Sequence, residues 1–155
     1  MPSFRIFAVA AMAAGLLVAG AVQAQGAASK AEQTLKYRKA LYQVLGYNFG
    51  PMGAMTKGAM PYDQAEFARR AERVAMIAPL LSEGFSADTR GLPNSELKPE
   101  MWANRADFDA KMKDLVDRSA TLASVAKAGD AAKTKAAFLE TAKTCGACHD
   151  KYKND

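Results

Sequence analysis

The chain has 155 residues, which is enough for one domain and short for two. Half of its residues are apolar and its glycine and proline contents are ordinary, so we expect a buried core and exclude a largely disordered chain. The formal net charge of +5 is mild, and the Lys and Arg residues alternate with acids, which argues against a nucleic-acid-binding protein.

The first 24 residues predict a signal peptide. Arg5 supplies a positive charge, residues 6–21 form an apolar run without a charge, and Val22-Gln23-Ala24 has the small residues that a signal peptidase reads. The alternative is an uncleaved membrane anchor, because a run of this length could nearly span a bilayer. We expect cleavage before Gln25, which leaves residues 25–155 as one soluble domain in a bacterial periplasm with no membrane attachment.

The first predicted helix covers about residues 29–49. Ser29 and Glu32 match a capping box at its start, and the Gly-Pro pair that ends in Pro51 predicts its stop. Residues 50–61 contain three Gly and two Pro, so we expect a loop there. The apolar positions that recur with helical spacing are Leu35, Leu41, Tyr42, Leu45 and Phe49.

A second helix is predicted from about residue 62 to residue 81. Asp63 is a candidate N-cap, and Pro79 should kink or stop the helix near its end. Residues 82–99 follow as a connection rich in Gly, Pro, Ser and Asn. Loops of that length are uncommon in compact domains and often have a function, so we expect a crossover that wraps part of a cofactor pocket.

Two further helices are predicted in the last third of the chain. One starts near Pro99 and continues to about Ala126, and Gly129 closes it. The other begins at about Asp130 and runs to the end of the chain. The third helix has a bundle seam at Phe108, Met112, Leu115, Ser119 and Leu122. Four amphipathic helices joined by three connectors predict an all-α fold, an antiparallel four-helix bundle.

The last helix carries the motif C-x-x-C-H at Cys145, Cys148 and His149, which are the only cysteines and the only histidine of the chain. Covalent haem attachment requires one thiol for each vinyl group and an adjacent imidazole that reaches the iron. The motif places all three groups within one helical turn and on one side. It predicts one haem c per chain, with His149 as the axial ligand of the iron.

Three other interpretations of the motif compete with haem attachment. A C-x-x-C redox or disulfide pair is compatible with an oxidising compartment, but it does not need the following His and normally begins a helix in a βαβ unit. A zinc site lacks ligands, because the chain has only three soft ones. The third interpretation is chance.

A stripe on the first helix adds to the prediction. Arg38, Tyr42, Leu45 and Phe49 follow one another at steps of four, three and four residues and so share one face. The apolar members could be ordinary core. Arg38 is harder to explain as core, because a buried guanidinium needs an anionic partner, which a haem propionate would provide.

The sequence resembles the cytochrome c prime family over the whole of the predicted mature chain. The resemblance rests on the position of the haem motif in the last helix and on short segments along the whole chain. These segments are Lys36-Tyr37-Arg38, Phe49-Gly50-Pro51-Met52, Lys57-Gly58-Ala59-Met60-Pro61-Tyr62-Asp63, Lys98-Pro99-Glu100-Met101-Trp102 and Cys145-Gly146-Ala147-Cys148-His149-Asp150.

The resemblance implies a five-coordinate, high-spin haem c, a periplasmic location and an antiparallel homodimer built on the first two helices. Arg38 and Lys39 would lie by the propionates, and Tyr42 over the open face of the iron. Family members often have Gln at the position of Lys39, and many have Arg at the position of Lys153. Two weaker candidates for the haem edge are Lys98 and Glu100.

Two functions fit these features. One is electron transfer, which requires a redox partner, and the other is binding of a diatomic gas such as nitric oxide or carbon monoxide. We do not expect an enzyme, because a peroxidase needs a distal acid or base and no second His exists. The alternative is a low-spin electron carrier with His and Met ligands, but no Met lies on the stripe that contains Arg38 and Tyr42.

Overall fold

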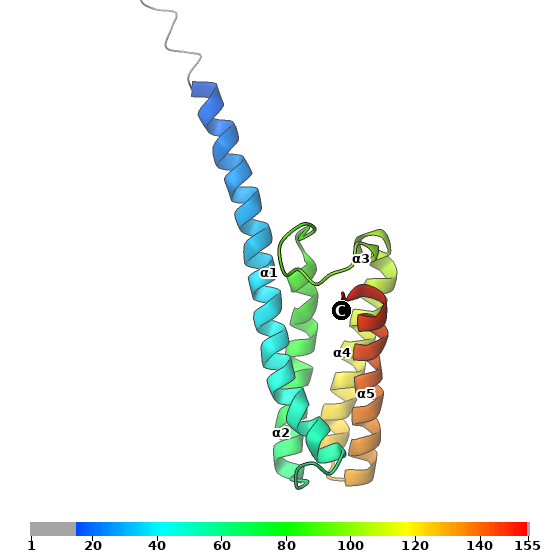
Figure 1. Ribbon diagram of the computed structural model, residues 1–155. Coiled ribbons are helices and arrows are strands. Elements are labelled where there is room, and N and C mark those ends of the chain that lie inside the picture. The colour runs from blue at the N-terminus through cyan, green and yellow to red at the C-terminus, as the bar shows by residue number, and fades with distance from the viewer. Residues whose placement is uncertain (1–14, 155) are drawn as a thin grey trace, which may run out of the picture.

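The computed structural model describes residues 15–154 and forms a bundle of four long helices (Figure 1). The predicted four-helix bundle is confirmed. The elements, in chain order, are α1 (Gly15–Thr56), α2 (Gln64–Ile77), the 3-10 helix η1 (Ala78–Phe85), α3 (Glu100–Ala103), α4 (Arg105–Lys127) and α5 (Ala131–Tyr152). Residues 1–14 of the predicted signal peptide lie outside the described residues. Among the residues that are described, no helix combines the length and apolarity needed to cross a membrane.

The first helix is longer than predicted at both ends. It passes Ser29 without a break, and it continues through Pro51 to Thr56 (Figure 1). Pro51 removes one backbone donor and normally destabilises a helix interior. The turn that follows it buries Met52 and Met55 in the core, and this burial offsets the loss. The predicted start at Ser29 and stop at Pro51 are therefore wrong.

The second predicted helix has its expected start and its expected change at Pro79. The carboxylate of Asp63 accepts a hydrogen bond from the backbone N–H of Glu66 at 2.9 Å, as an N-cap does. At Ala78 the α-helix gives way to η1, whose first turn contains Pro79. Residues 86–99 then form the crossover connection, which we call the crossover loop.

The third predicted helix is interrupted once. Asn104, with φ −122° and ψ 45°, separates the short α3 from α4. The side-chain amide of Asn104 donates to the carbonyl of Glu100 at 3.0 Å, an alternative to continued helix that asparagine readily offers. Gly129, with φ 86°, closes α4, and Asp130 caps α5 through the N–H of Lys133.

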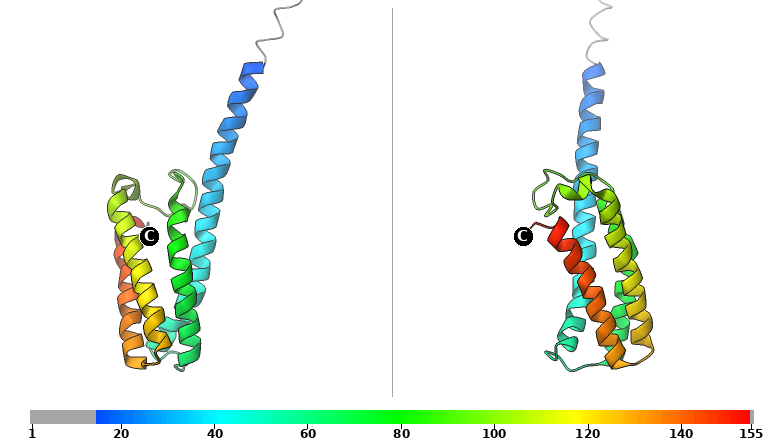
Figure 2. Two further views of the ribbon diagram at one scale, coloured as in Figure 1. Left: turned by 180° about the vertical axis from the view of Figure 1, so that it is seen from behind. Right: turned by 90° about the vertical axis from the view of Figure 1, so that its right-hand side faces the viewer.

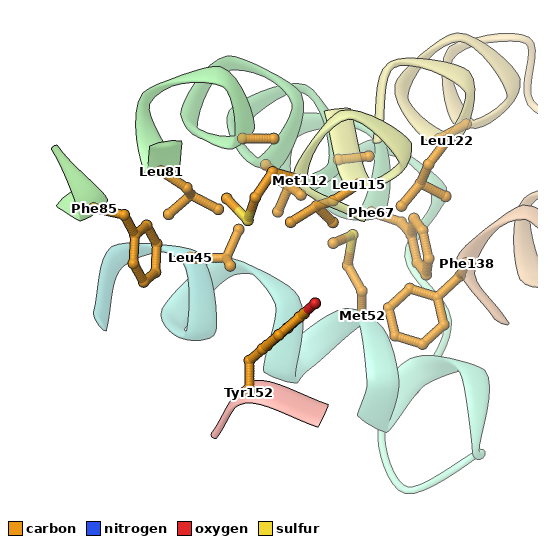
Figure 3. Close-up of a cluster of buried hydrophobic side chains, with 14 of the residues drawn as sticks. Leu45, Met52, Phe67, Leu81, Phe85, Met112, Leu115, Leu122, Phe138 and Tyr152 are labelled. Atoms are coloured by element: carbon orange, nitrogen blue, oxygen red, sulfur yellow. The ribbon is translucent and has the colours of Figure 1, made fainter. Parts of the chain in front are cut away.

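The core lies between the second half of α1, α2, η1, α4 and α5 (Figure 3). Phe138 of α5 stacks on Phe49 of α1, with ring centroids 4.5 Å apart, and meets Phe67 of α2 edge to face at 6.0 Å. Each fully buried side chain of this size contributes about 1.5–3 kcal/mol. The core extends to the crossover-loop end, where Phe85, Phe108 and Tyr152 belong both to the core and to the wall of the candidate site.

Candidate haem site

A cavity of about 310 Å³ lies at the end of the bundle where α5 finishes. The crossover loop and the end of α5 are at this same end of the molecule (Figure 2). The volume of the cavity is in the range of small-molecule sites, and the cavity walls combine aromatic and aliphatic surfaces with a few polar groups. The lining residues are Arg38, Lys39, Tyr42, Phe85, Ser95, Glu96, Leu97, Phe108, Cys148, His149, Tyr152 and Lys153.

The haem motif faces this cavity from the last turns of α5. Cys148 and His149 line it, and Cys145 lies one turn earlier, with its Sγ donating to the carbonyl of Thr141 at 3.8 Å. Both cysteines are free and half-buried, and burial raises the pKa of each thiol. In the described part of the chain, no three His, Cys, Asp or Glu residues cluster to hold a metal ion. This arrangement gives no support to a disulfide or a zinc site.

The guanidinium of Arg38 is buried beside the cavity, with 5% of the residue exposed. Its Nη1 donates to Thr89 Oγ1 at 3.2 Å and to the Gly84 carbonyl at 3.4 Å, and its Nη2 donates to the Ser95 carbonyl at 2.9 Å and to Ser95 Oγ at 3.1 Å. It also lies 4.9 Å from the ring centroid of Phe85. Arg38 thereby ties α1 to η1 and to the crossover loop.

The described residues give Arg38 neutral acceptors, and its predicted contact with a haem propionate stays a prediction. None of their carboxylates comes within 4 Å of its guanidinium, and neutral carbonyl and hydroxyl oxygens satisfy four of its donor contacts. Its remaining donor, Nε, can still meet an anion in the cavity. No sequence pattern predicts the acceptors Thr89 and Ser95, because they lie in an aperiodic loop.

Gly84 allows η1 to approach Arg38 closely. A Cβ at residue 84 would lie 2.8 Å from the Cβ of Arg38 and 3.0 Å from its Cα. Backbone cannot yield as the tip of a side chain can, so any larger residue would push η1 away from α1. The absence of a side chain at Gly84 therefore helps to set the position of Phe85 at the cavity wall.

Tyr42 lies one turn after Arg38 and faces the haem motif. Its ring meets Phe85 edge to face, with centroids 6.4 Å apart. Burial, and then the neighbouring Cys148 and Cys145, raise the pKa of the phenol above its ordinary value. The phenol consequently stays protonated at neutral pH, which disfavours phenolate ligation of the kind seen in catalase.

The crossover loop closes the cavity by pairing with the end of α5. Leu97 and Lys153 form an isolated antiparallel bridge, the N–H of Lys98 donates to the Tyr152 carbonyl at 2.9 Å, and the N–H of Asn154 donates to the Glu96 carbonyl at 3.1 Å. The predicted role of this loop as a wall of the pocket agrees with this geometry.

The sequence-predicted residues divide into two groups. Lys39 lines the cavity together with Arg38, Tyr42, Cys148 and His149. Lys98 and Glu100 do not line it. Lys98 points its Nζ at the carbonyl of Asp150, 3.2 Å away, and Glu100 is exposed in the first turn of α3.

One contact beside the cavity follows from no sequence pattern. Tyr152 is buried with its ring in the cavity wall, and its hydroxyl donates to Asp107 Oδ2 at 2.5 Å. Lys151 Nζ lies 3.0 Å from the same oxygen. These two hydrogen bonds lower the pKa of Asp107 and tie the end of α5 to the start of α4. Nothing in a linear sequence links residues that are 45 positions apart.

The residues around the cavity fit a covalently bound haem. Two reduced thiols and an imidazole lie on one helix face, Phe85, Leu97 and other apolar groups provide walls for a planar ring, and the cations Arg38, Lys39 and Lys153 are available to acidic substituents.

Comparisons with known proteins agree with this fit. The family model described as Cytochrome C' matches residues 33–153. A cytochrome c' of Alcaligenes xylosoxydans is 33% identical over 125 residues, which are 81% of this chain and 96% of the relative. The structure of cytochrome c prime from Shewanella frigidimarina has 42% sequence identity to this chain and a TM-score of 0.77, and the match covers 81% of this chain and 97% of the relative's chain.

A third relative is the structure of a nitric oxide complex of a variant of cytochrome c prime from Alcaligenes xylosoxidans. It is 32% identical to this chain, with a TM-score of 0.73, and the match covers 81% of this chain and 97% of the relative's chain. The match of the family model covers well over half of the chain and includes the whole of the haem motif. The chain belongs to the cytochrome c prime family of c-type haem proteins.

Proposed function

We propose that this protein binds one haem c covalently, through thioether bonds to Cys145 and Cys148, with His149 as the axial ligand of the iron. The observation that carries the proposal is the cavity itself, because it joins the motif on α5 to Arg38 and Tyr42 on α1, more than 100 residues away. The bound haem would supply a one-electron redox centre and a binding position for a gas.

The iron is five-coordinate in this proposal. In the described part of the chain, no Met and no second His lines the cavity. Met52, Met55, Met101 and Met112 are buried in the core, where filling space is their ordinary role. Tyr42 and Phe85 instead present aromatic rings to the cavity, which favours exclusion of water. These observations disfavour the low-spin carrier with His and Met ligands.

We propose binding of small gases and electron transfer as the functions of this site. The nitric oxide complex of a similar protein supports gas binding. The apolar space beside Tyr42 supports it independently, because a diatomic gas needs little polar recognition. A catalytic role is not proposed, since the chain's single His serves as the axial ligand and leaves no imidazole for acid–base chemistry.

Visible absorption and electron paramagnetic resonance spectra of the purified protein test this proposal. We expect high-spin spectra in both oxidation states, and a new ferrous spectrum on addition of carbon monoxide or nitric oxide. A low-spin spectrum that neither gas alters would contradict the five-coordinate site and would favour the His and Met alternative.

The protein is proposed to act in the periplasm as a homodimer. Support for the dimer comes from large apolar side chains that remain exposed on α1 and at the end of the α2–η1 segment, since such groups are typical of interfaces. They are Tyr37, Val44, Tyr47, Met76 and Leu80.

Sedimentation analysis tests the dimer. Val44→Glu would place a charge in the proposed interface, and we expect it to shift the protein toward monomer. Leu139→Glu is the matched control, because Leu139 is equally exposed but lies on α5. A monomeric wild-type protein, or equal effects of the two substitutions, would contradict the proposal.

A further inference from the structure

Glu96 adopts a backbone conformation that a glutamate rarely adopts. Its φ of 53° lies in the left-handed region, where a side chain is strained and glycine is not. Asn94, two residues earlier, has φ 60°, but asparagine tolerates this region. Strain of this kind persists only where the surrounding structure enforces it, and it concentrates at functional sites.

The backbone of Glu96 is enforced from both sides. Its carbonyl accepts the N–H of Asn154 at the end of α5, and the preceding residue, Ser95, is bonded through its carbonyl and hydroxyl to the buried guanidinium of Arg38. The following residue, Leu97, forms an antiparallel backbone bridge with Lys153. The crossover loop is thus fastened to α1 and to α5, and between these attachments it holds Glu96 at the cavity wall.

The charge of Glu96 is unusual among its neighbours. Of the side chains that line the cavity in the described part of the chain, it carries the only carboxylate. Lys153 Nζ lies 4.0 Å from Glu96 Oε2, and Arg38 and Lys39 of α1 also line the cavity and add positive charge to it. A negative charge in this position faces the same cavity as His149.

We propose that Glu96 tunes the reduction potential of the iron, by stabilising the ferric state with its carboxylate. This inference rests on the proposed function, since it requires a haem in the cavity. Reduction adds one electron to the iron and removes one unit of positive charge from the site. A nearby negative charge opposes that change and lowers the potential, and its Coulomb energy remains appreciable beside an apolar cavity. The side chain of Glu96 is 59% exposed, so salt should screen the effect.

Spectroelectrochemical titration of Glu96→Gln tests the proposal. The substitution keeps the shape of the side chain and removes its charge, so we expect a more positive potential than in the wild type. The difference should shrink as ionic strength rises from about 0.01 M to about 1 M, because the Debye length falls from about 30 Å to about 3 Å. Lys153→Met removes the facing cation and should move the potential in the opposite direction.

Glu72→Gln is the matched control. Glu72 also pairs with a lysine at 4.0 Å, namely Lys127, the last residue of α4. Lys127 lies twenty residues after Asp107, which is at the cavity end of α4, and twenty residues of helix span about 30 Å. We expect no change of potential in this variant. Glu96→Asp, which keeps the charge and tolerates the backbone conformation, should retain a potential close to that of the wild type.

Two results would overturn the proposal. One is a potential in Glu96→Gln that equals the wild-type value at low salt, with haem content and thermal melting unchanged. The other is an equal shift in Glu96→Asp and Glu96→Gln, which would mean that shape and not charge matters. A wild-type protein without covalent haem would contradict the proposed function instead, so the two failures can be told apart.

Discussion

At the scale of single residues, the proposed site makes Tyr42 the side chain that limits access to the open face of the iron. Tyr42 lines the cavity, and its phenol remains protonated because burial raises its pKa. We expect Tyr42→Ala to speed association of carbon monoxide with the ferrous protein by at least about tenfold, which corresponds to about 1.4 kcal/mol of barrier. Flash photolysis measures this rate.

Tyr42→Phe is the control for this prediction, since it keeps the ring that blocks the approach and removes only the hydroxyl. Its association rate should stay near that of the wild type. An unchanged rate in Tyr42→Ala would remove Tyr42 from the distal side of the haem.

Thr89 is fully buried and accepts a hydrogen bond from Arg38 at 3.2 Å. Thr89→Val keeps the volume but leaves a donor of the buried guanidinium without its acceptor, so we expect a loss of about 1–3 kcal/mol in the free energy of unfolding. Denaturant titration measures this loss. Thr121→Val is the control, because the hydroxyl of Thr121 is exposed and bonds within its own helix, and we expect a change of less than about 0.5 kcal/mol. Equal losses in the two variants would show that Thr89 does not support Arg38.

These residues illustrate what sequence patterns can predict about the site. Cys145, Cys148 and His149 are close in sequence, and helical geometry alone puts them on one face. Helical spacing likewise predicts that Tyr42 shares a face of α1 with Arg38. The partners of Arg38 could not be predicted in this way, because Thr89 and Ser95 reach it only through the path of an aperiodic loop.

At the scale of elements, the pairing of α4 with α5 depends on Asp107 at the cavity end. The bonds from Tyr152 and Lys151 hold the pKa of Asp107 below its ordinary value of about 3.9, so the folded state binds this proton less tightly than the unfolded state. The resulting stabilisation is present above that ordinary value and is lost as pH falls through the lower, folded-state pKa.

We therefore expect Asp107→Asn to be less stable than the wild type at pH 7. The difference should begin to shrink below about pH 4 and should close once pH is below the lowered, folded-state pKa of Asp107. Thermal melting across this pH range measures it. Asp117→Asn serves as the control, since Asp117 pairs with Lys113 within α4 and ties no second helix. A difference between Asp107→Asn and the wild type that persists at low pH would mean that the carboxylate charge is not responsible.

The boundaries of the elements were harder to predict than their existence. Asp63 and Asp130 cap their helices as expected, because a cap is a local hydrogen bond. The stop at Pro51 was wrong, because burial of Met52 in the core outweighs the local cost of proline. The break at Asn104 is not predicted either, because the helical spacing of apolar residues continues on both sides of this one residue.

At the scale of the whole molecule, the bundle was predictable because its helices bury seams of regular spacing. Phe108, Met112, Leu115, Ser119 and Leu122 are all buried in the structure. What the seams could not predict is the cavity at one end, where regular packing stops. There the crossover loop, the end of α5 and Arg38 together build a space that suits a planar cofactor.

The central claim is that this space holds a haem bonded to Cys145 and Cys148. Mass spectrometry of the denatured protein, made in a bacterium that matures c-type cytochromes, tests it most directly. We predict that the wild-type polypeptide carries the mass of one haem and that the Cys145→Ser/Cys148→Ser double variant carries none. A wild-type chain without the added mass, or a double variant that keeps it, would contradict the account.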